Sequence, residues 1–183
     1  GAGAANETQT LAVTAKSDKL DLIPNPTVSY SSANAIGFLT FAPLTNANGT
    51  ATITVTASDG ALENGTTNRA FTVTANPVND PPSFTKGPDQ PVKDDAGPQR
   101  VVAWATGISS GPLDESGQTR QFTVTNDMPA LFAVPPAVDP DGTLTYEPKL
   151  NTNGIAIVTV RLKDNGGTLS GGVDTSEPQT FSI

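Results

Sequence analysis

An internal repeat is the feature that most constrains what this chain can fold into. Residues 38–43 (FLTFAP) match residues 143–148 (TLTYEP), residues 46–49 (NANG) match residues 151–154 (NTNG), and residues 52–55 (TITV) match residues 157–160 (IVTV). All three matches share an offset of 105 residues, so the register holds without a gap. A repeat of this length predicts two copies of one structural unit along the chain.

Within each copy, apolar residues alternate with Thr or Ala, which is typical of strands with one buried face. Asn-Gly, Asp-Gly and Gly-Gly pairs supply the turns between them, and no stretch has a helical period. These patterns predict an all-β protein made of two antiparallel β-sandwich domains. The alternating pairs are Leu11/Val13, Leu39/Phe41, Ile53/Val55 and Phe71/Val73 in the first copy, and Val102/Trp104, Phe122/Val124, Leu144/Tyr146, Val158/Val160 and Phe181/Ile183 in the second.

A proline-rich stretch separates the two copies. Pro77, Pro81 and Pro82 cannot donate to a β-ladder and they stiffen the backbone. We therefore expect a first domain at residues 1–76, a semi-rigid linker at residues 77–84 and a second domain at residues 85–183.

The two copies differ at their beginnings. Residues 85–106 have no counterpart in the first copy, although residues 99–104 (QRVVAW) form a good first strand in the second. The first domain is therefore expected to lack its own first strand, which would expose apolar core and an open ladder. The missing strand could lie upstream in the same protein, or a neighbouring chain could donate it.

Composition excludes several classes of function. The net charge of −8 and the lack of a Lys/Arg patch exclude nucleic acid as a partner. The chain has no Cys and no His, which removes thiolate sites and the usual catalytic base. Asp139 and Asp141 flank Pro140 in a turn rather than face each other across a cleft, so we expect no enzyme. No apolar run is long enough to span a membrane, and the start at Gly1 suggests a mature fragment.

Three segments carry a family resemblance. They are residues 53–60 (ITVTASDG), residues 78–84 (VNDPPSF), and residues 132–134 (FAV) followed by residues 141–144 (DGTL). With these segments the chain resembles the tandem cadherin-like and Ig-like repeats of large bacterial surface or extracellular proteins. It departs from them in residues 44–48 (LTNAN), which lack two acidic residues of the family pattern, and in a linker one residue shorter that lacks the leading Asp.

The resemblance implies Ca²⁺ at the domain junction, held by oxygen ligands. The corresponding positions are Asn79 and Asp80 in the linker, Asp114 and Glu115 before the second strand, and Asp164 after the long strand. Glu7 and Asp59 are their counterparts in the first copy. A purely structural interpretation is also open, since Asn-Asp before Pro-Pro forms a turn and residues 164–167 form a hairpin loop.

The expected function is that of a structural or adhesive repeat module outside the cell or on its surface. Its partners would be neighbouring repeats of the same protein or identical copies in a filament. The alternative is a recognition module that binds a carbohydrate or a cell-surface protein through the loops at residues 107–117 and 165–177.

Overall fold

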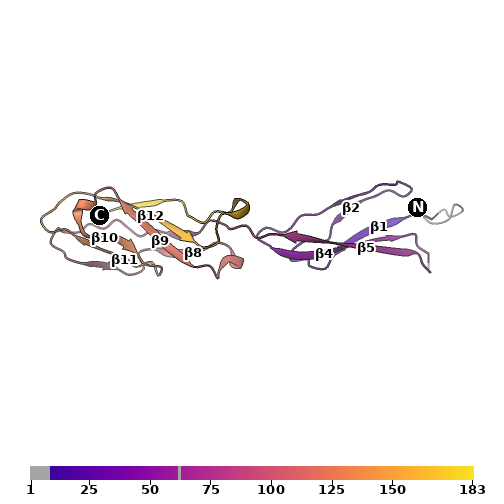
Figure 1. Cartoon of the computed structure of the whole chain (residues 1–183), viewed down its shortest axis with the longest axis horizontal. Coiled ribbons are helices and arrows are strands. Elements are labelled where there is room, and N and C mark those ends of the chain that lie inside the picture. The colour runs from indigo at the N-terminus through magenta and orange to yellow at the C-terminus, as the bar shows by residue number, and fades with distance from the viewer. Residues whose placement is uncertain (1–8, 62) are drawn as a thin grey trace. The chain divides into compact units, whose positions relative to one another are not determined.

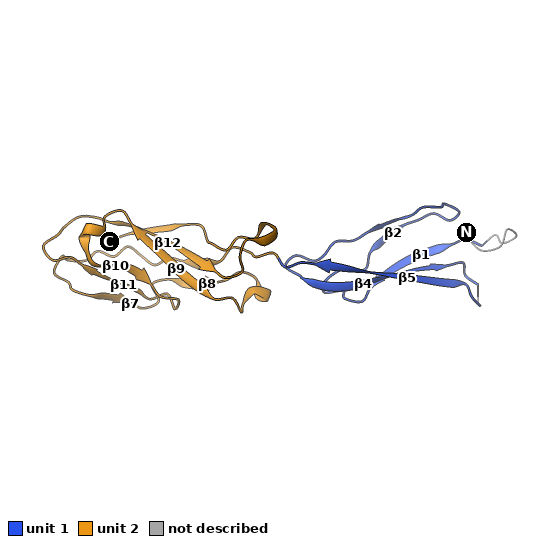
Figure 2. Ribbon diagram, in the orientation of Figure 1, with its two compact units in different colours: residues 1–77 blue, residues 78–183 orange. Residues whose placement is uncertain are grey.

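The computed structural model describes residues 9–61 and 63–183, and the chain divides into two compact units, residues 1–77 and residues 78–183 (Figure 2). The protein is all-β and its sheets are antiparallel, as the alternation predicted. Helical geometry within the described residues is limited to three short 3₁₀ turns. These are η1 (Leu113–Glu115), η2 (Pro129–Leu131) and η3 (Leu169–Gly171).

Unit 1 contains a three-stranded and a two-stranded sheet (Figure 1). The three-stranded sheet has the order β1-β4-β5, in which β4 and β5 form a long hairpin. The second sheet pairs β2 with β3. The strands are β1 (Ala12–Ser17), β2 (Thr27–Ser29), β3 (Phe38–Thr40), β4 (Gly49–Ser58) and β5 (Thr66–Ala75).

Unit 2 has two three-stranded sheets, in the orders β13-β12-β9 and β10-β11-β7, and a short pair, β6-β8. Its strands are β6 (Ser83–Thr85), β7 (Gln99–Val101), β8 (Thr106–Ser109), β9 (Arg120–Asn126), β10 (Phe132–Val138), β11 (Leu144–Pro148), β12 (Ile157–Asp164) and β13 (Gln179–Ser182). The stretch expected to be a linker therefore carries β6 and lies within unit 2 from residue 78 onward.

The repeat extends to the pairing register of the strands. Leu39 of β3 pairs with Val28, and its counterpart Leu144 of β11 pairs with Val138. In the other sheet Ile53 pairs with Phe71, as Val158 pairs with Phe181. Strands β1 to β5 thus correspond to β9, β10, β11, β12 and β13.

A side-chain contact at the end of the first strand is repeated as well. Asp18 accepts a hydrogen bond from the backbone N–H of Thr52 at 2.7 Å, and Asp127 accepts one from Ile157 N–H at 2.7 Å. In both units, then, a carboxylate at the end of the strand accepts a hydrogen bond from a backbone N–H that the β-ladder would otherwise leave without an acceptor.

The contact of Asp18 predicts a pH effect on unit 1. The Thr52 backbone N–H, which stabilises the charged form, holds the pKa of Asp18 below its ordinary value. Because the folded pKa is the lower one, this stabilisation is present above the unfolded pKa and is lost as pH falls through the folded value. Thermal melts followed by NMR signals of β4 should show a midpoint that falls as the pH drops below about 4, the ordinary range of an Asp carboxyl, and the fall should be smaller in Asp18→Asn. An equal fall in the variant would contradict this assignment.

The two units differ in the size of their cores. Unit 2 buries a continuous cluster that includes aromatic residues, whereas the buried cluster of unit 1 has none. The buried members in unit 2 are Phe84, Trp104, Ala105, Phe122, Phe132, Val138, Leu144, Tyr146, Ala156, Val158, Val160, Leu162 and Phe181. Those in unit 1 are Ala15, Leu22, Ile23, Ala51 and Ile53.

The predicted strand at residues 99–104 is wrong in its second half. β7 ends at Val101, Val102 is exposed, and Ala103 has a φ of 54°. The backbone turns here because the Trp104 side chain packs in the core, where its ring centroid lies 4.4 Å from that of Phe181. Its indole Nε1–H donates to Pro88 O at 3.0 Å, so a buried hydrogen bond and a ring contact override the local alternation.

Candidate cation site at the start of unit 2

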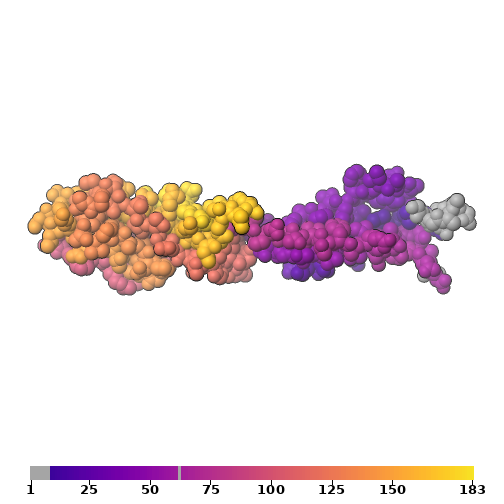
Figure 3. Space-filling view, viewed as in Figure 1, coloured from indigo at the N-terminus to yellow at the C-terminus, as the bar shows by residue number. Residues whose placement is uncertain are grey.

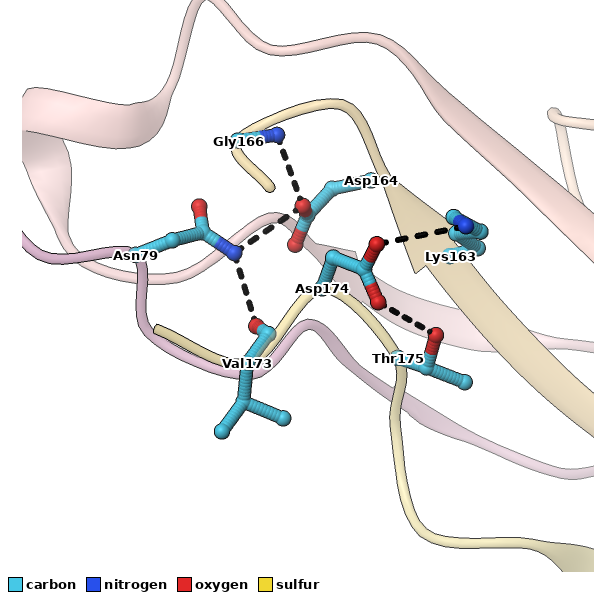
Figure 4. A network of polar contacts seen from close by, with 7 residues as sticks. All are labelled: Asn79, Lys163, Asp164, Gly166, Val173, Asp174 and Thr175. Atoms are coloured by element: carbon cyan, nitrogen blue, oxygen red, sulfur yellow. Dashed lines mark hydrogen bonds and ion pairs between the residues drawn. The ribbon is translucent and has the colours of Figure 1, made fainter. Parts of the chain in front are cut away.

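Asn79 is the central residue of a polar network that attaches the beginning of unit 2 to its last loop (Figure 4). Its side-chain N–H₂ donates to Asp164 Oδ1 at 3.1 Å and to Val173 O at 2.7 Å. Its Oδ1 accepts from Gln118 Nε2 at 2.8 Å, and its backbone O accepts from Val173 N–H at 2.9 Å. One amide side chain therefore joins three segments that are far apart in the sequence.

Glycines make room for this amide. A Cβ on Gly166 would coincide with the side-chain oxygen of Asn79, and a Cβ on Gly172 would lie 3.0 Å from the Asn79 backbone N. Gly166 N–H also donates to Asp164 Oδ1 at 2.9 Å. The loop after β12 therefore needs glycine where it approaches Asn79.

Asp80 and Glu115 form a second, adjacent contact. The backbone N–H of Asp80 donates to Glu115 Oε1 at 2.8 Å. Glu115 lies at the end of η1 and is only 7% exposed, and a side chain on Gly111 would collide with its Oε2. The close approach of Gly111 therefore allows this carboxylate to lie buried against the strand entrance.

Three oxygens of this network have no hydrogen-bond partner: Glu115 Oε2, Gln118 Oε1 and Asp164 Oδ2. All three are buried, and Asp164 as a whole is 4% exposed. A buried acceptor without a donor loses its hydration without compensation, and a carboxylate oxygen loses most. Carboxylate and amide oxygens are the ligands that Ca²⁺ prefers, so the chemistry of these atoms fits a hard cation.

Asp174 lies beside the network but has its own partners (Figure 4). The Thr175 hydroxyl donates to Asp174 Oδ1 at 2.8 Å, and Lys163 Nζ lies 3.2 Å from Asp174 Oδ2. The Thr175 hydrogen bond, followed by the Lys163 contact, lowers the pKa of Asp174. This carboxylate is therefore already satisfied by protein groups, unlike Asp164.

The structure brings the side chains of Asn79 and Asp164 into this network and places Glu115 in the adjacent contact, which Asp80 enters through its backbone N–H. The fifth expected ligand, Asp114, is exposed on η1. In the part of the chain that is described, no group of three or more His, Cys, Asp or Glu side chains is close enough together to hold a metal ion. The counterpart Asp59 accepts from Ala61 N–H at 2.9 Å, as Asp164 does from Gly166, whereas Glu7 lies outside the described residues.

Gln118 and the glycines at positions 111, 166 and 172 were not predicted from the sequence. A signal for Gln118 was present, because Gln-Thr recurs at residues 9–10 and 118–119. The glycines had no such signal, since glycine is common in the loops and only the close approach of distant segments makes these positions special.

Replacing Asn79 with alanine should destabilise unit 2 by about 1–3 kcal/mol, because the substitution removes one of the two donors to Asp164, the donor to the Val173 carbonyl and the acceptor of Gln118. Trp104, the single Trp of the chain, lies in unit 2, so the fluorescence of the full chain reports this transition. Asn153→Ala, in an exposed loop of the same unit, is the control. Equal urea midpoints for the two variants would show that the network contributes nothing to the stability of unit 2.

Comparison with protein-family models, with curated proteins and with solved structures yields no match to this chain. Among residues 9–61 and 63–183, no helix is long and apolar enough to cross a membrane.

Proposed function

We propose that this chain is a structural or adhesive repeat module of an extracellular surface protein or filament, built from two tandem Ig-like or cadherin-like β-sandwiches, and that it is not an enzyme. The repeated register of β2-β3 and β10-β11, and of β4-β5 and β12-β13, supports two units of one kind. Repetition of one supersecondary unit extends a chain without adding new chemistry, which suits a spacer or stalk.

The observation that carries the proposal is the contact between the first and last segments of unit 2. Lys86 N–H donates to Gln179 Oε1 at 3.1 Å, and Gln90 N–H donates to Ser182 O at 2.9 Å. Residue numbers rise together in both segments, so residues 84–90 run parallel to β13. Gln179 Nε2 also donates to Phe84 O at 2.6 Å, and Ser182 N–H donates to Asp89 Oδ1 at 2.8 Å.

A parallel contact between terminal segments resists tension. Force applied through residue 78 and Ile183 pulls the two segments in opposite directions along their own axes. The four hydrogen bonds are then loaded together in shear, instead of opening one after another. Trp104, hydrogen-bonded to Pro88 O, packs against Phe181 and adds side-chain packing to the same contact.

Stretching the full chain in optical tweezers tests this role. We expect unit 2 to unfold at a markedly higher force than unit 1. Gln179→Ala removes two of the four hydrogen bonds and should lower the unfolding force of unit 2, whereas Gln121→Ala, on the exposed face of β9, should leave it unchanged. A low unfolding force for unit 2 that neither variant alters would remove the support for a load-bearing role.

Calcium is the second part of the proposal. Glu115, Gln118 and Asp164 would supply the oxygens, and Asp80 and Asn79 adjoin them. A bound ion would supply positive charge to two buried carboxylates and so tie the entrance of unit 2 to its η1 turn and last loop. An ion bound in this way would hold these three segments of unit 2 in place without any new backbone contact.

We expect Ca²⁺ to stabilise unit 2 by about 2.7 kcal/mol at a hundred times its dissociation constant. In the double variant Glu115→Gln/Asp164→Asn this effect should disappear, and the variant should be the more stable protein in chelator because two unpaired buried charges are gone. Asp95→Asn, an exposed acidic residue elsewhere in unit 2, is the control. Trp104 fluorescence in urea with Ca²⁺, Mg²⁺ or EDTA is the measurement. Equal midpoints in Ca²⁺ and EDTA would refute the cation site and leave the mechanical role standing.

One observation favours the alternative, a recognition module. Leu113 and Leu169 lie in the two loops expected to bind a partner and are 89% and 87% exposed. Apolar side chains at loop tips suit a protein surface better than a sugar. If this function holds, Leu113→Ser/Leu169→Ser should abolish adhesion of chain-coated beads to cells without changing unit 2 stability. Unchanged adhesion would exclude these loops.

A further inference from the structure

Arg120 and Asp164 lie directly opposite each other in unit 2, on the neighbouring strands β9 and β12. Both side chains are on the inner face of this sheet, since Phe122 and Leu162, two residues along each strand, are buried in the core. Opposite residues of an antiparallel pair have Cβ atoms about 4.5–5.5 Å apart. The Arg120 guanidinium can therefore reach the Asp164 carboxylate without a change in the backbone.

The two charges are not paired with each other in the structure. Asp164 is 4% exposed, its Oδ1 accepts from Asn79 and Gly166, and its Oδ2 has no hydrogen-bond partner. Within the described part of the chain, the Arg120 guanidinium takes part in no hydrogen bond or ion pair, whereas Lys163 pairs with Asp174. A buried carboxylate oxygen without a donor is costly, so a cation that reached Asp164 Oδ2 would lower that cost.

A groove gives the arginine room to move. Arg120 and Asp164 both line an open groove of about 650 Å³, whose walls come from β9, β12 and the end of β10, where Asp139 lies. On the face of unit 2 drawn in Figure 3, segments from the middle of the chain (orange) and from its end (yellow) lie side by side. Because the groove is open, the Arg120 side chain can turn toward Asp164, or toward Asp139 and water, without displacing core residues.

The repeat indicates that the fold does not require an arginine at this position. The Gln-Thr pair that recurs at residues 9–10 and 118–119 is followed by Leu11 in the first copy and by Arg120 in the second. Asp59 corresponds to Asp164, and each accepts a hydrogen bond from the backbone N–H two residues later. An apolar side chain is thus compatible with this strand position, and the charge of Arg120 calls for a role specific to unit 2.

We propose that Arg120 is the internal counter-cation of Asp164, and that the Arg120 guanidinium and a metal cation exchange at this carboxylate. Without the metal, the guanidinium donates to Asp164 Oδ2. When a cation binds the carboxylate oxygens, repulsion between like charges moves the guanidinium back into the groove. The inference rests on the proposed cation site and adds the residue that sets its affinity.

The Arg120–Asp164 pair compensates the burial of Asp164 only in part, because the carboxylate is still kept from water. A divalent ion held by several oxygens can therefore displace the arginine. Binding then requires the pair to be broken, so the dissociation constant of the ion is raised by the factor that the pair contributes.

Calorimetric titration of the full chain with Ca²⁺ tests the competition. Arg120→Leu, which introduces the residue found in the first copy, should lower the Ca²⁺ dissociation constant about fivefold or more. A purely structural role of Arg120 would not tighten binding. Arg100→Leu, exposed on β7, removes the same charge outside the groove and should leave the dissociation constant nearly unchanged.

A double-mutant cycle in EDTA tests the pair in the absence of metal. Urea unfolding of unit 2, followed by Trp104 fluorescence, is compared for the wild type, Arg120→Leu, Asp164→Asn and the double variant. The cycle cancels what each substitution does alone, including the packing of the new leucine. We expect coupling in the unfolding constant by the same factor as the gain in Ca²⁺ affinity, because both report the loss of one interaction. Arg100→Leu and Asp164→Asn should be additive.

NMR of the arginine Nε–H groups follows the exchange directly, with the Arg120 signal identified by its loss in Arg120→Leu. In EDTA this Nε–H should exchange slowly with water, and Ca²⁺ should make the exchange faster. Arg161, whose Nη1–H donates to Ser176 O, is the internal control and should not respond.

Three results would overturn the proposal. Additive effects of Arg120→Leu and Asp164→Asn in EDTA would show that the two side chains do not pair. An unchanged or weaker Ca²⁺ affinity of Arg120→Leu would show that the arginine does not compete. An Arg120 signal that is the same in EDTA and at saturating Ca²⁺ would show that the guanidinium is not displaced. Coupling in EDTA in a chain that binds no Ca²⁺ would instead refute the proposed cation site and leave the Arg120–Asp164 pair standing.

Discussion

Replacing Trp104 with alanine is expected to destabilise unit 2 by about 3–5 kcal/mol, the usual cost of removing a large aromatic residue from a core. The indole is 2% exposed, and its ring centroid lies 4.4 Å from that of Phe181. Its Nε1–H donates a hydrogen bond to Pro88 O. The substitution removes the packing, the ring contact and the hydrogen bond together. It also leaves residues 84–90 without the side chain that holds them beside β13.

The effect can be measured by urea unfolding of the full chain, followed by NMR signals of β12, since the fluorescent reporter is lost in this variant. Val102→Ala, two residues away and exposed, is the matched control and should change stability by less than about 0.5 kcal/mol. The variant should also unfold at a lower force in tweezers. A loss below about 1 kcal/mol would mean that residues 84–90 are held beside β13 by their hydrogen bonds alone, without a contribution from Trp104.

Gly142→Ala should destabilise unit 2 by about 3 kcal/mol or more, whereas Gly37→Ala at the same repeat position of unit 1 should cost about 1 kcal/mol or less. Gly142 has a φ of 85°, where a side chain is strained, and its Cβ would collide with the backbone carbonyl of Ala105. A backbone carbonyl cannot rotate away as a side chain can, so residues 103–105 themselves would have to shift. At Gly37 the nearest atoms are Tyr30 Cδ2 at 3.1 Å, Tyr30 Cβ at 3.2 Å and the Ser29 carbonyl oxygen at 3.3 Å, so a shift of a few tenths of an ångström makes room for a methyl group.

This matched pair also tests how closely residues 103–105 pack against Gly142. The asymmetry arises because residues 103–105 press on Gly142, whereas among the described residues nothing presses in the same way on Gly37. Trp104 fluorescence reports the first variant, and NMR signals of β4 report the second. Equal costs would contradict the interpretation that the Ala105 carbonyl makes Gly142 the more sensitive position.

Much of the fold follows from local pattern. The alternation at Ile53/Val55 and Val158/Val160 predicted β4 and β12, and the structure confirms the all-β class and its antiparallel sheets. The 105-residue offset placed β3 and β11 at corresponding positions, and their pairing partners correspond as well. Such features are predictable because a strand's two faces alternate along the chain, which is a property of neighbouring residues alone.

The candidate cation site was harder to predict from the sequence. Asn79, Asp80, Glu115 and Asp164 were selected by resemblance to a family. The structure places Asn79 and Asp164 in one network with Gln118, which had not been selected, and Asp80 and Glu115 in the adjacent contact. Burial decides the role of each, and burial depends on which distant segment comes near. Asp164 is left with an unpaired oxygen and Asp174 is not, because Lys163 and Thr175 contact only Asp174.

By itself, then, the sequence determined that this protein is built from strands and that it contains a repeated unit. Alternation and an exact offset in residue number carry that information in one dimension. Only the tertiary structure decided that β7 stops at Val101, that Trp104 turns into the core, and that Phe71 stays exposed where Phe181 is covered. These outcomes depend on contacts between residues about 15 to 95 positions apart, whose hydrogen bonds and buried area outweigh the preferences of the local sequence.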